Sequence, residues 1–133
     1  MVSVTSRLLA SRLETALTRP SLNITVEQWR ILFYLWNEDG INQQELAKRA
    51  SKEKSTITRQ IDGLIKKGLV VKQKHGSDKR DKLIFLTENG KNIENEALTA
   101  ASDITHDAEK GIEKDELLIF KKVLKQIIAN VRP

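Results

Sequence analysis

Lysine and arginine side chains gather in one stretch of the chain, between Lys48 and Lys82. Twelve of the 23 basic residues lie there with only four acidic ones, a local charge of +8, while the other 98 residues hold 11 basic and 14 acidic ones. A positive charge concentrated in this way is the electrostatic footprint of a surface that meets phosphates. A merely solvated face would explain the number of charges but not their sign, so the pattern favours nucleic acid as the partner.

Within this stretch, residues 54–67 have the periodicity of an amphipathic helix that Gly68 ends. The apolar face consists of Ile57, Ile61, Leu64 and Ile65, and the polar face of Ser55, Thr56, Arg59, Gln60 and Gly63. Arginine can bond bidentately to guanine, and serine or threonine can donate or accept at base edges. An ordinary amphipathic helix would explain the apolar face alone, so the small, glutamate-free polar face favours a helix that reads the major groove. Gly63 lowers the helix propensity, either because DNA approaches closely there or because the position is unconstrained.

The segments that follow indicate a β-hairpin. Residues 69–74 and 82–86 are short runs rich in apolar and β-branched side chains, and the turn between them, residues 75–80, contains Gly76 and basic side chains. The recognition helix is preceded by a short helix that Asn42 caps and by a longer, buried one that opens with the capping box of Thr25 and Gln28. A helix-turn-helix followed by a hairpin is a winged helix. The predicted fold class is therefore mainly α (α+β), a winged helix-turn-helix with a two-stranded β-wing.

Helices are also predicted at both ends of the chain. Residues 4–17 form an amphipathic helix, Thr87 caps a long polar helix that extends to Ile104, and the last segment presents a broad apolar stripe. We expect the N- and C-terminal helices to mediate dimerisation, because one small winged-helix core cannot cover two additional stripes. The interface residues that we expect are Leu9, Leu13, Leu117, Phe120, Leu124, Ile127 and Ile128. The alternative is that both helices pack only on their own subunit.

Composition excludes several chemistries. The chain has no cysteine, so it has no disulfide, thiolate nucleophile or cysteine-ligated zinc, and its two histidines lack a metal-ligand spacing. No cofactor and no metal are expected. Ser55, His75 and Asp78 could form a hydrolytic trio on paper, but no nucleophile-elbow motif accompanies them, so we expect no enzyme. No apolar run approaches the length of a membrane span and no signal peptide is evident, which predicts a cytoplasmic protein.

Several of these motifs together resemble the MarR (multiple antibiotic resistance regulator) family. They include Trp29-Arg30-Ile31-Leu32, Glu45-Leu46-Ala47, Ser55-Thr56-Ile57-Thr58-Arg59, Lys67-Gly68-Leu69-Val70, and Asp78-Lys79-Arg80 followed by Leu86-Thr87. The resemblance covers nearly the whole chain. It implies a homodimeric transcriptional regulator that places two recognition helices in successive major grooves of a pseudo-palindromic operator. We expect a repressor, and an activator is the alternative, because the direction of regulation depends on where the operator lies relative to the promoter. The chain is then one domain, 1–133, with dimerisation helices in 1–20 and 88–133 and a DNA-binding lobe in 25–87.

The resemblance also implies roles for single residues. Ser55, Thr56 and Arg59 match positions that meet bases or nearby phosphates, and Arg80 matches the wing arginine that enters the minor groove. Asp78 matches the wing acid, which we expect to pair with an arginine. The remaining candidates for DNA contact are Lys54, Gln60, Lys72, Lys74, Lys79 and Lys82, the lysines as phosphate neutralisers. The wing departs from the family pattern, because Gly76-Ser77 stands where proline is common and Asp81 replaces a small residue.

Regulation by a small molecule is a further implication of the resemblance. Many relatives release DNA when an aromatic or phenolic acid binds between the dimer helices and the DNA-binding lobe. Trp29, Phe33, Tyr34 and Trp36 are the candidate walls of such a pocket, although aromatic residues at this spacing are more often core. The alternative function is a winged-helix protein-interaction module without sequence-specific DNA binding.

Overall fold

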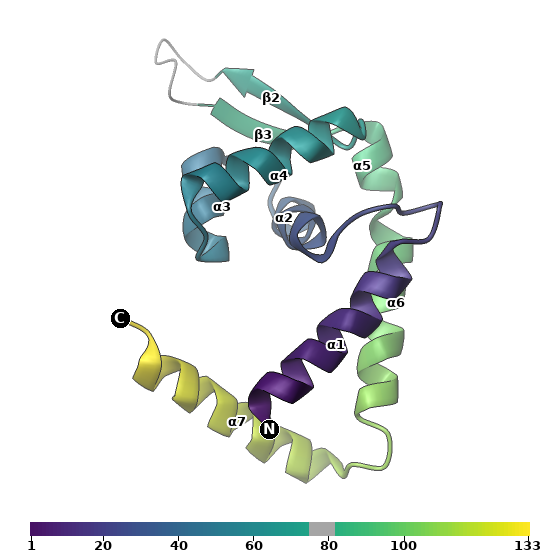
Figure 1. Ribbon diagram of the computed structural model, residues 1–133, viewed down its shortest axis with the longest axis vertical. Coiled ribbons are helices and arrows are strands. Elements are labelled where there is room, and N and C mark those ends of the chain that lie inside the picture. Colours follow the sequence, from purple (N-terminus) through teal and green to yellow (C-terminus); the bar gives the residue numbers. More distant parts are fainter. Residues whose placement is uncertain (75–81) are drawn as a thin grey trace. The chain divides into compact units, whose positions relative to one another are not determined.

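The computed structural model of the chain describes residues 1–74 and 82–133 (Figure 1). Its helices are α1 (Val2–Leu17), α2 (Val26–Asn37), α3 (Gln43–Ala50), α4 (Lys54–Lys66), α5 (Glu88–Asn92), α6 (Glu94–Ala108) and α7 (Lys114–Val131). Its strands are β1 (Ile41–Asn42), β2 (Val70–Lys74) and β3 (Lys82–Leu86). Contacts divide the chain into two compact units, Met1–Ala101 and Ser102–Pro133, each of which is described by itself.

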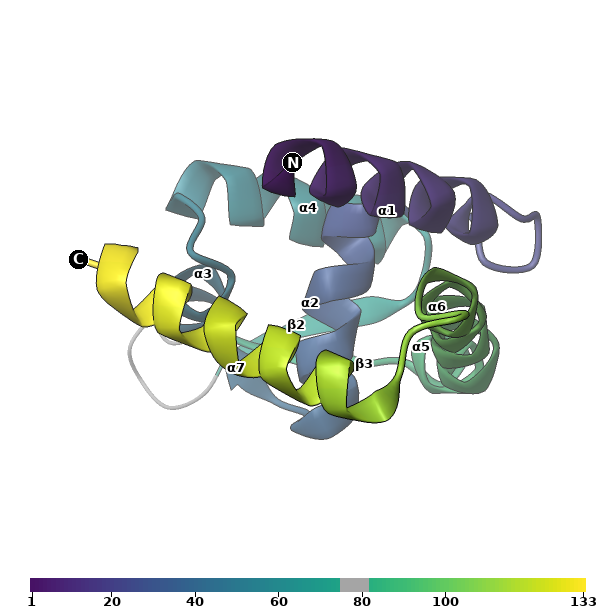
Figure 2. The same ribbon diagram turned by 90° about the horizontal axis from the view of Figure 1, so that it is seen from below.

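Helix α2 is the centre of the first unit. Figures 1 and 2 show it among α1, α3, α4 and the strands, and its Ile31, Leu32 and Leu35 are at most 1% exposed. The predicted capping box starts it, because the Thr25 hydroxyl accepts from the Gln28 N–H at 3.1 Å and Gln28 Oε1 accepts from the Thr25 N–H at 3.2 Å. The core of this unit therefore surrounds the one helix whose sequence is apolar on most sides.

The hairpin of β2 and β3 is confirmed, and a third strand extends it. Strand β3 pairs antiparallel with β2, Val70 opposite Leu86, and on its other edge with the two residues of β1. Asp39 holds this junction, because its Oδ1 accepts from the Gly40 N–H at 3.0 Å and from the Leu86 N–H at 2.9 Å. The prediction of a two-stranded sheet missed β1 because this strand is too short to show a period.

The recognition helix α4 packs closely on α2 at Gly63. A Cβ at this position would lie 2.7 Å from Nε2 of Gln28, a side chain that is only 5% exposed. Oε1 of Gln28 also accepts from Lys67 Nζ at 2.8 Å, and Lys67 donates to the Asn23 carbonyl at 2.7 Å. Burial lowers the pKa of the Lys67 ammonium. Gly63 thus faces the protein interior, and neither explanation offered by the sequence, close DNA or an unconstrained position, applies.

One long helix was predicted after Thr87, and the structure has two. Thr87 caps as expected, accepting from the Gly90 N–H at 3.1 Å, but the helix breaks at Ile93. Trp36 Nε1 donates to the Gly90 carbonyl at 2.9 Å, the carbonyl that a continuous helix would offer to Glu94. This contact from α2 takes the carbonyl at which the helix is interrupted, so α5 ends at Asn92 and α6 starts at Glu94 after the single residue Ile93.

We predict that Gly90→Ala strongly destabilises the first unit. A Cβ there would lie 2.1 Å from the Leu69 carbonyl oxygen, a backbone atom that cannot move aside without disturbing β2. The expected loss is about 3 kcal/mol in the free energy of unfolding, measured by urea denaturation. The exposed Asn92 of the same helix provides the control, since Asn92→Ala should change stability by less than about 0.5 kcal/mol. A Gly90→Ala protein as stable as the unaltered chain would contradict this packing.

The second unit, Ser102–Pro133, consists of the C-terminal part of α6 and the whole of α7. Helix α7 starts with a capping box in which the Glu116 carboxylate accepts from the Glu113 N–H at 3.3 Å, and Lys121 lies 3.7 Å from Glu109. None of its residues is buried. Across both described stretches, 1–74 and 82–133, no helix has the length and apolar character needed to cross a membrane.

Candidate nucleic-acid interface

Helix α4 presents one polar stripe to the outside. Its buried face consists of Ile57, Ile61 and Leu64, each at most 2% exposed. The opposite stripe follows the spacing i, i+4, i+7, i+11 and contains Ser55, Arg59, Asp62 and Lys66, all exposed. Lys54 is exposed at the first residue of the helix. Ser55 and Arg59, two of the predicted base readers, therefore lie side by side on the accessible surface.

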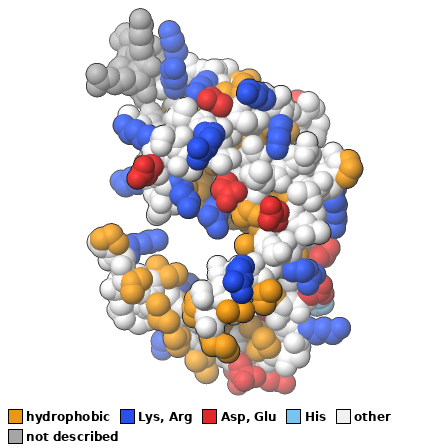
Figure 3. All heavy atoms as spheres, in the orientation of Figure 1, with side chains coloured by type: hydrophobic (Ala, Val, Ile, Leu, Met, Phe, Trp, Pro, Cys, Tyr) orange, Lys and Arg blue, Asp and Glu red, His pale blue; other side chains and the backbone are white. Residues whose placement is uncertain are grey.

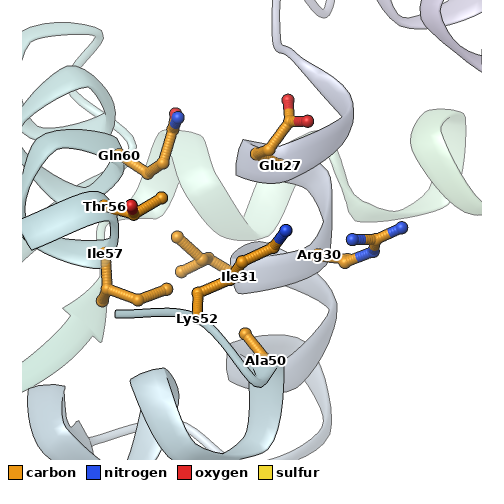
Figure 4. Close-up of a pocket in the computed structure, with 8 residues that line it drawn as sticks. All are labelled: Glu27, Arg30, Ile31, Ala50, Lys52, Thr56, Ile57 and Gln60. Atoms are coloured by element: carbon orange, nitrogen blue, oxygen red, sulfur yellow. The ribbon is translucent and has the colours of Figure 1, made fainter. Parts of the chain in front are cut away.

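Thr56 and Gln60 lie on a different side of α4. Both are half-buried and line a small cleft against α2, together with Glu27, Arg30 and Lys52 (Figure 4). The sequence grouped these two residues with Ser55 and Arg59 on one polar face. The structure separates them, because packing on α2 covers the flank of α4 on which they lie.

The helix-turn-helix is held by polar contacts as well as by its core. Gln43 at the start of α3 donates to the Thr58 hydroxyl of α4 at 2.6 Å. At the other end of α3, Arg49 pairs with Glu38 at 2.9 Å and with Glu45 at 3.1 Å, and the hydrogen bonds that it donates to the Glu45 and Glu38 carboxylates raise the pKa of its guanidinium. Gln43 therefore ties α3 to α4, and Arg49 ties α3 to the end of α2.

The basic residues of the wing strands divide into two kinds. Lys74 and Lys82 face each other across β2 and β3 at the described end of the hairpin, and both are exposed. Lys72 is half-buried, and its Nζ lies 3.4 Å from Oδ1 of Asp62 on α4. Asp78, Lys79 and Arg80 lie outside the described residues. Figure 3 shows lysine and arginine side chains gathered over α3, α4 and the hairpin strands.

Three of the four candidate pocket aromatics are in contact. The rings of Trp29 and Phe33 stack with centroids 5.6 Å apart, and Phe33 meets Tyr34 edge-on at 6.4 Å. The Tyr34 hydroxyl donates to the Arg49 carbonyl at 3.1 Å, and Trp36 is bonded to Gly90. The indole N–H of Trp29 is buried without an acceptor in the part of the chain that the structure describes. In those same stretches, no three acidic or histidine side chains form a metal site.

The candidate dimer residues are accessible to differing degrees. On α1, Leu9 is 41% exposed, whereas Leu13 packs partly on the core of its own unit. On α7, Leu117 and Leu124 are half-buried, while Phe120, Ile127 and Ile128 are 47–54% exposed. Within its own unit, α7 therefore exposes several large apolar side chains, which is uncommon for a monomer.

Comparison with known proteins identifies the chain. Residues 24–82 match the profile of the MarR family. The HTH-type transcriptional regulator FarR of Neisseria gonorrhoeae is 32% identical over 113 residues, which cover 82% of this chain and 77% of FarR. The multiple antibiotic resistance protein MarR of Escherichia coli K12 is 30% identical over 108 residues, 80% of this chain and 75% of that protein. The chain belongs to the MarR family.

The fold agrees with this assignment. A MarR family regulator from Listeria monocytogenes, solved in complex with a 26mer DNA, superposes with a TM-score of 0.87 at 26% identity, covering 98% of this chain and 85% of the other. The resemblance inferred from the wing and helix motifs is confirmed, as is the winged helix. This MarR family member is a DNA-binding transcriptional regulator, and its relatives named above are regulators rather than enzymes.

Sequence reasoning overlooked two residues of the outward stripe of α4. Asp62 and Lys66 lie one and two turns beyond Arg59 on the same face, but neither was among the candidates. The signal was present, because residues 55, 59, 62 and 66 follow the 3.6-residue period. Asp62 was not a candidate because a cluster of positive charge was the signal used for DNA contact, and an acidic residue does not fit that signal.

Proposed function

We propose that this MarR family protein binds a pseudo-palindromic operator as a homodimer and represses transcription from it. The outward stripe of α4 is the observation that carries this proposal. Ser55 and Arg59 stand accessible there, above a buried face that fixes their orientation, and Lys74 and Lys82 lie at the end of the adjoining strands. A helix with such a stripe fits the major groove of B-DNA.

Within this interface, Arg59 would read guanine and Ser55 an adjoining base or phosphate. Thr56 and Gln60, which line the cleft toward α2, would contribute at the margin of the groove rather than at its centre. Lys54, Lys74 and Lys82 would neutralise phosphates, and Lys72 would act partly through Asp62. The roles of Asp78, Lys79 and Arg80 at the wing rest on the family motif alone.

A homodimer would explain the uncovered apolar side chains. Exposed Phe120, Ile127 and Ile128 on α7 and Leu9 on α1 would form an isologous interface, supported by the half-buried Leu13, Leu117 and Leu124. Two-fold symmetry would then match the symmetry of a palindromic site. On this view 1–20 and 88–133 serve dimerisation and 25–87 binds DNA.

The experiment that tests operator binding is selection of genomic fragments by the purified protein. We expect recovered fragments to share an inverted repeat whose half-sites are about 10 base pairs apart, and a reporter placed downstream to be silenced by the protein. Recovery of random fragments would contradict the proposal and favour the alternative, a protein-interaction module. The DNA-bound relative gives that alternative no support.

An aromatic carboxylate is the effector class that this proposal includes. The stacked rings of Trp29 and Phe33 offer an apolar wall, and the unpaired Trp29 N–H would suit an acceptor on the ligand. Such a ligand could regulate only by binding more tightly to the form that cannot hold DNA.

We predict that benzoate changes the emission of Trp29 and weakens operator binding in the same concentration range. Trp29 and Trp36 are the two tryptophans, so the difference between fluorescence titrations of the unaltered protein and of Trp29→Phe reports on this wall. The matched variant Trp29→Phe should lose the response and keep DNA binding. Benzoate that releases DNA equally from the Trp29→Phe protein would place the effector elsewhere.

A further inference from the structure

The recognition helix carries one acidic side chain, and it stands on the outward stripe. Of the residues of α4, only Asp62 is acidic, and its side chain is 55% exposed. It lies one turn beyond Arg59, on the stripe proposed above to enter the major groove. A carboxylate in this place is repelled by the phosphates of any duplex, so its presence lowers affinity for DNA in general.

The contribution of Asp62 to the stability of the fold does not by itself explain why an acidic residue lies on this stripe. Lys72 Nζ lies 3.4 Å from Asp62 Oδ1, with the lysine side chain 25% exposed, so the pair connects α4 to β2 at the surface. Ion pairs this exposed contribute little to stability, about 0.2–1 kcal/mol. The contact does orient the carboxylate, because Lys72 approaches it from the strand and leaves the outward side of Asp62 accessible.

A carboxylate can recognise a base in the major groove that arginine, serine and lysine side chains do not select. Cytosine presents its N4 amino group there, and a carboxylate accepts from it, whereas thymine and guanine present acceptors at the corresponding edges. Adenine also presents an amino group, N6, but beside the acceptor N7, which repels a carboxylate. Asp62 is thus complementary to Arg59, whose donors suit guanine. A site that offers no donor leaves the carboxylate close to phosphate with Lys72 as its partner but with no hydrogen bond from DNA, which is a penalty against wrong sequences.

We propose that Asp62 is a specificity-determining residue of this interface. Its charge lowers the affinity for DNA of any sequence, and a hydrogen bond from a cytosine N4 restores that affinity at the operator. Lys72 is the positioning residue of Asp62. The proposal rests on the proposed operator binding and adds to it a base preference, a cytosine in each half-site near the guanine read by Arg59.

The test compares Asp62→Asn with the unaltered protein on a selected operator and on a scrambled duplex, by fluorescence anisotropy over a range of salt. Asparagine keeps the size of the side chain and removes its charge. We expect affinity for the scrambled duplex to rise about threefold and the operator-to-scrambled ratio to fall about tenfold. Fragment selection with this variant should lose the cytosine at one position of each half-site.

Two further variants distinguish base recognition by Asp62 from a purely structural role of the Asp62–Lys72 ion pair. Asp62→Lys combined with Lys72→Asp restores an ion pair between α4 and β2. The preference for the operator over the scrambled duplex should return if the pair only stabilises the wing. It should stay low if Asp62 recognises a base. Lys66→Met, on the same stripe, should weaken both duplexes equally. If the unaltered protein discriminates and Asp62→Asn discriminates as well, Asp62 is not a specificity residue; if the unaltered protein binds neither duplex, operator binding itself is refuted.

Discussion

Replacing Arg59 with alanine should remove most of the preference of this protein for its operator. Arg59 is exposed on the outward stripe of α4, next to Ser55 and opposite the buried Ile57 and Ile61, so its guanidinium can reach a base edge without disturbing the core. A bidentate contact to guanine contributes about 1–3 kcal/mol of discrimination, so affinity for the operator should fall roughly 5- to 150-fold. Affinity for scrambled DNA should fall much less, and anisotropy titrations on the two duplexes measure both changes.

Lys74 provides the matched control for this prediction. It is also exposed and basic, but it lies on β2 opposite Lys82, where a phosphate contact is expected. Lys74→Ala should weaken both duplexes by a similar factor and reduce the slope of log affinity against log salt by about 1. If both variants lose affinity equally on every sequence, Arg59 is a phosphate contact and base reading must come from other residues.

An aspartate at Ile127 should separate the proposed homodimer into monomers. The Ile127 side chain is 47% exposed on α7, a helix without a buried residue, so the change should leave the fold of the chain intact. In an isologous interface each substitution occurs twice, and two uncompensated carboxylates would cost about 4 kcal/mol in total, a roughly thousandfold weaker dimer. Sedimentation velocity measures the association, and circular dichroism verifies the helical content.

Operator binding should be lost together with the dimer, since one half-site alone supports only weak binding. Lys122→Asp is the control, because Lys122 lies on the same helix about half a turn away from the apolar stripe. It should leave the dimer unchanged. An Ile127→Asp protein that remains dimeric and binds its operator would show that α7 does not form the interface.

Local features of this fold could be predicted from the sequence because neighbouring residues determine them. Thr25 and Gln28 satisfy the first amides of α2 by themselves, Asn42 caps α3 in the same way, accepting from the Gln44 N–H at 2.7 Å, and Gly68 ends α4 with a φ of +72°. The two wing strands followed from two short runs of strand-forming residues on either side of a turn that contains Gly76. For the same reason the outward position of Ser55 and Arg59 was predictable from the 3.6-residue period.

Other features depend on residues far apart in the chain and could not be predicted from it. The break between α5 and α6 needs the indole of Trp36, 54 positions before the carbonyl that it engages. Gly63 is explained by Gln28, and the partial burial of Thr56 and Gln60 by the neighbouring helix α2. In each case the side-chain pattern of one helix leaves open which flank a second helix will cover.

The binding of a selected duplex, compared with a scrambled duplex of equal length and composition, tests the proposed function most directly. Anisotropy titrations at several salt concentrations should show two protomers bound per selected duplex, a preference of at least about a thousandfold over the scrambled one, and affinity that falls steeply with salt. Equal affinity for the two duplexes, or no salt-dependent binding to either, would contradict sequence-specific DNA recognition by this protein.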